Sequence, residues 1–166
     1  MKIEREPGGR HFTLRKSNFK LAELRYPKWF NFDAQGSIGT VPVLLKKTSF
    51  WQSEYGIMVG SQPRGIIESR GWKGGFAIVV DWQFNGQTTT YLFRQRGFSN
   101  PRYELTTDLD EQLLITLRSK INWRRLVQEY SHEFNCPLPE ATSLELLLYS
   151  IHCMRLYQAR QAAAAS

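Results

Sequence analysis

Short segments in which apolar and polar residues alternate follow one another through most of the chain. Alternation with a period of two, bounded by Gly, Pro, Asn or Asp, is typical of strands that bury one face. The pattern predicts a mainly β protein with many short antiparallel strands. The expected strands cover residues 11–16, 19–24, 38–45, 54–59, 64–70, 76–82, 88–94, 103–105, 113–118 and, near the end of the series, 123–134.

Three connections between these strands carry recognisable signals. Asn85-Gly86 separates residues 76–82 from 88–94, and this pair predicts a type I′ hairpin because both residues tolerate a positive φ. The acidic segment 108–111 predicts a second hairpin, and residues 34–37 are interpreted as a turn. The segment 76–82 is β-branched and almost continuously apolar, which favours a central strand buried on both faces.

A different pattern begins after the last expected strand. Pro137 and Pro139 end the sheet, and Thr142 with Glu145 matches a capping box at the start of a helix. The sequence therefore predicts a helix over about residues 143–161. Its apolar residues leave no wide polar stripe, and the main interruptions are Glu145, Ser150, His152 and Arg155.

A helix that is apolar nearly all round is buried on every side or spans a membrane. The apolar run is shorter than the roughly 20 residues that a bilayer requires, so we expect protein to enclose it. An open sheet covers only one side of a helix, whereas a closed barrel covers all of it and also removes exposed sheet edges. We expect a single domain, residues 1–166, in which a closed antiparallel β-barrel encloses a hydrophobic C-terminal helix.

Several segments resemble a known family. They are Phe-Ser-Asn-Pro-Arg-Tyr-Glu-Leu at 98–105, Asp-Glu-Gln-Leu-Leu-Ile at 110–115, Trp123-Arg124 and the Leu-rich helix at the end. Together they resemble the tubby C-terminal superfamily, in particular its small LURP-one-related and scramblase-like members. The resemblance implies a barrel around a hydrophobic helix, no enzyme active site and, in the tubby branch, phosphoinositide headgroups bound by exposed Lys and Arg. The chain departs from it in having no distinct Lys-x-Arg headgroup motif.

Net charge adds a functional direction. Lys and Arg number 22 against 15 Asp and Glu, which gives a net charge of +7 and a pI near 9.6. Such a field attracts nucleic acid, anionic lipid headgroups or other acidic partners. No run of five or six like charges is present, so the sequence lacks the basic tail that is typical of many nucleic-acid-binding proteins.

The basic residues that lie in pairs or near aromatic residues are weak candidates for an anion site. These candidates are Lys46, Lys47, Arg94, Arg96, Arg102, Arg124 and Arg125. With the neighbouring Trp and Tyr residues they suit lipid headgroups or, alternatively, single-stranded nucleic acid. A third interpretation places the aromatic residues in the core and leaves the charges as scattered solvent contacts. We expect an anionic lipid headgroup or membrane surface as the partner, with nucleic acid as the alternative; the oligomeric state stays open.

Patterns for catalysis and metal binding are weak. His132 with Cys136 and the adjacent His152-Cys153 lack zinc-ligand spacing, and no nucleophile motif surrounds Cys153. Residues 71–75 are glycine-rich but precede a strand, so they do not predict a phosphate-binding loop at a helix start. We expect no enzyme activity, no metal and no cofactor.

The cellular compartment is inferred from two further features. Two cysteines are too few for a disulfide framework, and residues 1–7 have no apolar core of a signal peptide. The expected compartment is the cytoplasm, with peripheral membrane association where lipid headgroups are bound.

Overall fold

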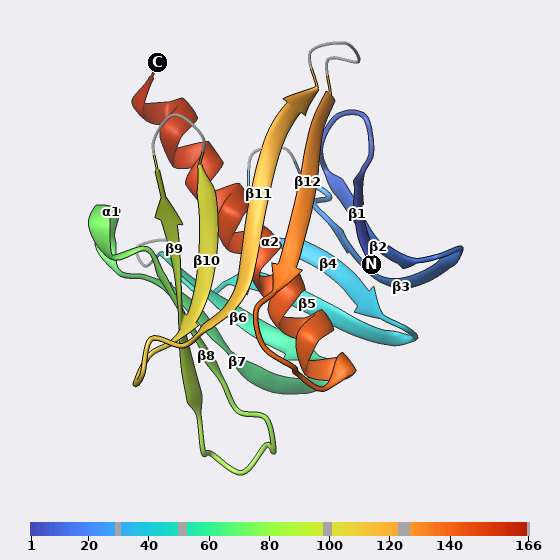
Figure 1. Ribbon diagram of the computed structural model, residues 1–166. Helices are drawn as coiled ribbons and strands as arrows, with labels where there is room; N and C mark the ends of the chain where they lie inside the picture. The colour runs from blue at the N-terminus through green and yellow to red at the C-terminus, as the bar shows by residue number, and fades with distance from the viewer. Residues whose placement is uncertain (29–30, 50–52, 98–100, 123–126, 166) are drawn as a thin grey trace.

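A closed barrel of antiparallel strands surrounds one long helix (Figure 1). The computed structural model describes residues 1–165 apart from 29–30, 50–52, 98–100 and 123–126. The strands are β1 (Lys2–Arg5), β2 (His11–Lys16), β3 (Phe19–Arg25), β4 (Ala34–Ile38), β5 (Val41–Lys47), β6 (Glu54–Val59), β7 (Gln62–Ser69), β8 (Phe76–Val80), β9 (Thr89–Arg96), β10 (Arg102–Thr107), β11 (Leu113–Asn122) and β12 (Val127–Phe134). The helices are α1 (Gly71–Gly74) and α2 (Glu140–Ala164).

Each strand pairs with its neighbours in the chain, and β1 pairs with β12 to close the ring. The mainly β, closed antiparallel barrel that the sequence predicts is confirmed. The pairing between β1 and β12 is short, because their register consists of one residue pair, Ile3 opposite Tyr130. By contrast, β11 and β12 stay in register from Ile115 opposite Phe134 to Asn122 opposite Val127. The β1–β12 junction, called the seam below, is therefore the weakest junction of the wall.

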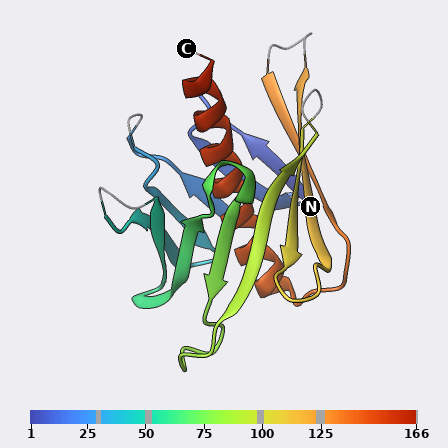
Figure 2. The same ribbon diagram turned by 90° about the vertical axis from the view of Figure 1, so that its left-hand side faces the viewer.

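Helix α2 fills the barrel. Every residue from Ser143 to Met154 is buried, as is Leu156, and their side chains belong to the same core as inward-facing residues of the strands. A view turned by 90° again shows the helix between opposite walls (Figure 2). The enclosed helix that its apolar circumference predicts is confirmed, and burial extends to the polar interruptions Glu145, Ser150 and His152.

The predicted capping box is wrong. The helix begins at Glu140, directly after Pro139, and no side chain caps its first turn. Instead of turning back toward Thr142, the Glu145 carboxylate accepts hydrogen bonds from Arg64 at 3.1 Å and from the Tyr149 hydroxyl at 2.8 Å. A buried carboxylate needs such partners, and this requirement outweighs the local capping pattern.

Two strands were not predicted. Residues 34–37 belong to β4 and are not a turn, so the expected strand 38–45 is in fact a hairpin of β4 and β5. The glycine that suggested a turn has another role, because a Cβ at Gly36 would collide with the carbonyl oxygen of Glu23 on β3. The second missed strand is β1, so strands begin at Lys2 and not near residue 11.

Two connections also differ from expectation. The β8–β9 hairpin exists, but its connection spans 81–88. Positive φ falls on Phe84 and Gly86 and not on Asn85, so the predicted two-residue turn, with positive φ at both Asn85 and Gly86, is not formed. The Asp81 carboxylate organises this loop by accepting backbone hydrogen bonds from Gln83, Asn85 and Gly86. The glycine-rich segment before β8 itself forms the single helical turn α1.

The barrel has two distinguishable ends. Odd-numbered strands run toward the end at which Ala164 leaves the barrel, here called the helix-exit end, and even-numbered strands run back (Figure 1). The connections after β2, β4, β6, β8, β10 and β12 therefore lie at the opposite, helix-entry end, where α2 starts. These ends position the charged side chains described next.

Candidate anion-binding surface

A row of arginines crosses three neighbouring strands. In the sheet register Arg102 of β10 lies opposite Arg96 of β9 on one side and Arg118 of β11 on the other, so the three residues share the outer face. All three are exposed. Arg118 was not among the predicted residues. Side chains of a strand alternate between its two faces, so the residue after the apolar, inward-facing Leu117 had to point outward, and this alternation could have identified Arg118.

One carboxylate neutralises part of this row. Glu104, two residues after Arg102, accepts from Arg102 Nε at 2.8 Å and from Arg96 Nε at 3.3 Å. Arg94 is half-buried and its Nη1 lies 3.3 Å from Glu111 Oε1. Arg118 makes no ion pair with the described residues. The row therefore keeps a net positive charge that is concentrated toward β11.

The predicted lysines lie elsewhere on the barrel. Both are exposed residues at the helix-exit end of β5, and β6, β7 and β8 separate them from β9. Lys46 lines a shallow pocket of about 280 Å³ together with Lys28 and Asp33, and the backbone N–H of Lys47 donates to Asp33 Oδ1. The structure thus does not bring the predicted cations into one site. Arg124 and Arg125 lie outside the described residues.

Charge nevertheless separates between the two ends of the barrel. At the helix-exit end the described strand ends and connections carry the exposed cations Arg10, Arg25, Lys28, Lys46, Lys47, Arg70, Arg96, Arg102 and Lys120. Fewer acids lie there, namely Glu6, Glu23, Asp33, Glu54, Glu68, Glu104 and Glu129. The helix-entry strand ends and turns instead carry Asp81, Asp108, Asp110, Glu111, Glu133 and Glu140 against Lys2, Lys16 and Lys20. The barrel therefore has a basic end and an acidic end.

Polar residues also lie inside the barrel. His152 of α2 is fully buried between Tyr26 and Tyr55: its Nδ1 is 3.3 Å from the Tyr26 hydroxyl, and the Tyr55 ring packs edge-on at 4.7 Å. Burial, with a contribution from the Arg155 charge, lowers the pKa of His152 to about 3, and burial raises the pKa of Tyr55 to about 12. These groups are neutral at pH 7, so His152 carries no charge for binding an anion.

The histidine and cysteine side chains that were weighed as metal ligands are considered next. Within the described ranges no three His, Cys, Asp or Glu side chains are arranged to hold a metal ion. Cys136 and Cys153 are free thiols, and burial raises the pKa of Cys153 well above its usual value. A buried, protonated thiol behaves as a small apolar side chain.

No family model, no curated protein and no solved structure matches this chain. Among the described helices none is long and apolar enough to cross a bilayer. The functional inference therefore rests on the geometry and charge of the chain itself.

Proposed function

We propose that this protein is a non-enzymatic, tubby-like barrel that binds an anionic phospholipid headgroup, a phosphoinositide included, through its helix-exit end. The observation that carries the proposal is the separation of charge between the two ends. A membrane with anionic lipids attracts a clustered basic surface with about 1 kcal/mol per Lys or Arg near the surface. An acidic opposite end would orient the barrel, with its basic end toward the lipid.

The unpaired cations support this orientation. Lys46 and Arg118 lie on different sides of the barrel, and neither makes an ion pair with the described residues. A cation without a carboxylate partner can bind a phosphate at a lower free-energy cost, because no existing ion pair has to break. In the cell this proposal corresponds to a cytoplasmic protein that associates peripherally with the membrane.

Single-stranded nucleic acid is the alternative ligand, and the described surface favours it less. Binding of that kind relies on aromatic side chains on which bases stack. Tyr103 and Phe93 lie on two of the strands that carry the arginine row, β10 and β9. Both rings are buried in the core, so they are not available for stacking with bases. We therefore treat nucleic-acid binding as an outcome of the test.

Vesicle sedimentation tests the proposal. The protein should bind vesicles that contain phosphatidylserine or a phosphoinositide, bind phosphatidylcholine vesicles weakly, and lose affinity as salt rises. Lys46→Glu at the basic end should weaken binding by about tenfold, and adding Arg118→Glu should weaken it further. The matched control is Lys16→Glu at the acidic end, which should bind like the unchanged protein.

Two outcomes would contradict the proposal. One is equal loss of binding in Lys46→Glu and Lys16→Glu, which would mean that net charge acts without regard to position. The other is tighter, salt-sensitive binding to poly-thymidine than to any anionic vesicle, which would favour the nucleic-acid alternative.

A further inference from the structure

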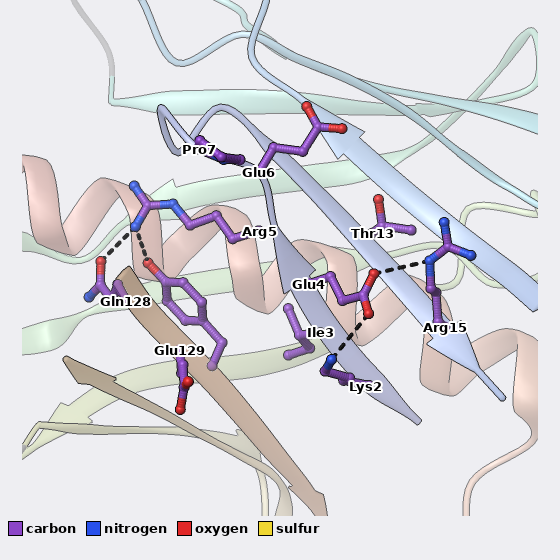
Figure 3. Close-up of a pocket in the computed structure, with 11 residues that line it drawn as sticks. Lys2, Ile3, Glu4, Arg5, Glu6, Pro7, Thr13, Arg15, Gln128 and Glu129 are labelled. Carbon is purple, nitrogen blue, oxygen red and sulfur yellow. Dashed lines mark hydrogen bonds and ion pairs between the residues drawn. The ribbon is translucent and has the colours of Figure 1, made fainter. Parts of the chain in front are cut away.

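A pocket of about 610 Å³ opens where β1 and β12 separate beyond their single registered pair (Figure 3). Its walls come from β1, the start of the following loop, β2 and β12. The outer part is lined by Lys2, Glu4, Glu6 and Arg15, and the inner part by Arg5, Gln128 and Tyr130. The volume suits a small organic molecule.

Ionised groups in the outer part of the pocket have partners. Lys2 Nζ and Arg15 Nε both contact the Glu4 carboxylate, at 3.2 and 3.1 Å. Glu6 contacts the ring of His11 at 2.6 Å, and Glu129 accepts from the Asn122 amide. In Figure 3 the Glu129 carboxylate points away from the guanidinium of Arg5.

Arg5 differs from these groups because its hydrogen-bond partners are neutral. Its Nη1 donates to Gln128 Oε1 at 2.7 Å and to the Tyr130 hydroxyl at 2.9 Å (Figure 3). Its Nε is buried and has no partner among the described residues. The loop closes against this guanidinium, since a Cβ at Gly9 would collide with it.

A second guanidinium faces the same aromatic cluster from α2. Arg155 lies over the ring of Tyr26 at 5.5 Å, and Arg5 lies over Tyr130 at 5.6 Å. Phe12 packs against both tyrosine rings, at 6.3 and 5.5 Å, and so links the two. Like Arg5, Arg155 has a buried Nε without a partner, and no carboxylate contacts either guanidinium in the described part of the chain.

The positive charges of Arg5 and Arg155 repel each other. Burial, and to a smaller extent the charge of Arg5, lowers the pKa of Arg155. Stacking on aromatic rings compensates only part of the cost, because a buried charge normally requires an opposite charge. An anion with several oxygens would satisfy the open donors of both planar guanidinium groups.

We propose that Arg5, which lines the pocket at the seam, and Arg155, which faces the same aromatic cluster from α2 and does not line the pocket, together bind a phosphate monoester that enters through this pocket. At pH 7 such a group carries close to two negative charges and three acceptor oxygens, which matches two guanidinium groups and the hydroxyl of Tyr130. The rest of the ligand would occupy the pocket between β1 and β12. The site uses residues other than the basic end and is independent of the vesicle-binding proposal.

Thermal unfolding with glycerol 3-phosphate as the probe tests the site. A ligand that binds only the folded state raises the midpoint as its concentration rises. The midpoint of the unchanged protein should rise, and Arg5→Met and Arg155→Met should each weaken binding by about thirtyfold or more. Lys16→Met removes an exposed cation that lies outside both the basic end and the pocket, so it is the matched control and should retain the full rise.

Folding failure can be separated from loss of binding. Without ligand, Arg155→Met should melt cooperatively and no lower than the unchanged protein, because the substitution removes repulsion between cations. A second arm uses vesicles that carry phosphatidic acid in phosphatidylcholine and scores the difference between the unchanged protein and Arg155→Met. A response to either probe that depends on both arginines supports the site, and the two arms distinguish a soluble monoester from a lipid one.

Three results would overturn the inference. The first is no change in midpoint with glycerol 3-phosphate together with no arginine-dependent binding to phosphatidic acid. The second is a response that persists in both variants, and the third is an equal loss of response in Lys16→Met. The vesicle-binding proposal is tested separately. It predicts that Lys46→Glu weakens binding to phosphatidylserine vesicles and that Arg155→Met binds these vesicles normally.

Discussion

His152 shows how a single polar residue can lie in an apolar core. Its ring is stacked beside Tyr26 and in edge contact with Tyr55, while Nε2 is buried without a partner among the described residues. The ring can remain there only as neutral imidazole, because protonation would place a second positive charge near Arg155. The protonation state of this residue is therefore coupled to folding.

This coupling predicts a stability that falls with acidification. The folded pKa of His152, about 3, lies below the unfolded value of 6.5, so the unfolded chain binds a proton that the folded chain refuses. The stabilisation is complete above pH 6.5 and is lost as pH falls from there toward 3. At pH 5 this residue should cost about 2 kcal/mol relative to pH 7.5.

Urea unfolding of the unchanged protein and of His152→Gln at both pH values measures the effect. The free energy of unfolding of His152→Gln should fall less between the two pH values, because the variant lacks the His152 contribution. Some loss should remain, because burial also lowers the pKa of His132, which is present in both proteins. An equal loss in the two proteins would show that His152 is not the group responsible.

At the scale of elements, an ion pair ties the start of α2 to the wall. Arg64 of β7 and Glu145 of α2 are only 11% and 9% exposed at their side chains, so each depends on the other for neutralisation. Arg64 also donates to the backbone oxygens of Asp81 and Trp82, and its guanidinium lies 4.2 Å from the Phe84 ring centroid. Removing one partner leaves a buried charge unpaired.

A double-mutant cycle should reveal this dependence. Glu145→Leu alone should lower the free energy of unfolding by about 3 kcal/mol, whereas Arg64→Met with Glu145→Leu should regain most of that loss. Denaturant unfolding of the single and double variants measures the coupling. Additive losses would mean that the pair is not coupled.

The whole of α2 is required for the barrel to have a core. A chain truncated before Thr142 should be insoluble or molten, because the inner faces of the strands would lose their packing partner. Circular dichroism and thermal melting provide the measurement. A control chain that ends after Arg160, which removes only the exposed end of the helix, should melt cooperatively; a soluble, cooperatively melting truncation before Thr142 would contradict the prediction.

Sequence reasoning succeeded for elements whose signal is local and failed where distant contacts decide. The alternation in β2 and β6 matched the observed bounds, and the apolar circumference of α2 was enough to predict a closed wall around it. Strand β4 was missed because its glycine, Gly36, suggested a turn. Gly36 is instead needed because the backbone of β3 passes too close for a Cβ, and no local sequence pattern shows this contact. Arg5 and Arg155 were missed as a pair, since only closure of the barrel brings residues from opposite ends of the chain to one cluster.

At the scale of the molecule, the strands do not hold together equally. The seam joins β1 to β12 through one registered pair, whereas β10 pairs with β9 from Arg102 to Thr107 and with β11 from Arg102 to Thr106. Local opening should therefore begin at the seam. In native-state hydrogen exchange, amides of β1 should exchange before those of β10; similar protection of both strands would contradict this order.

The position of α2 in the chain has a consequence for biosynthesis. All twelve strands of the described structure precede the helix that fills them, and the wall closes only when Ile3 meets Tyr130. The chain must therefore be synthesised through α2 before its apolar inner surface can be covered, and contacts this distant in sequence form slowly. During translation the emerging strands expose apolar surface that chaperones can bind. A chain whose synthesis stops after β12 would lack the helix that fills the barrel.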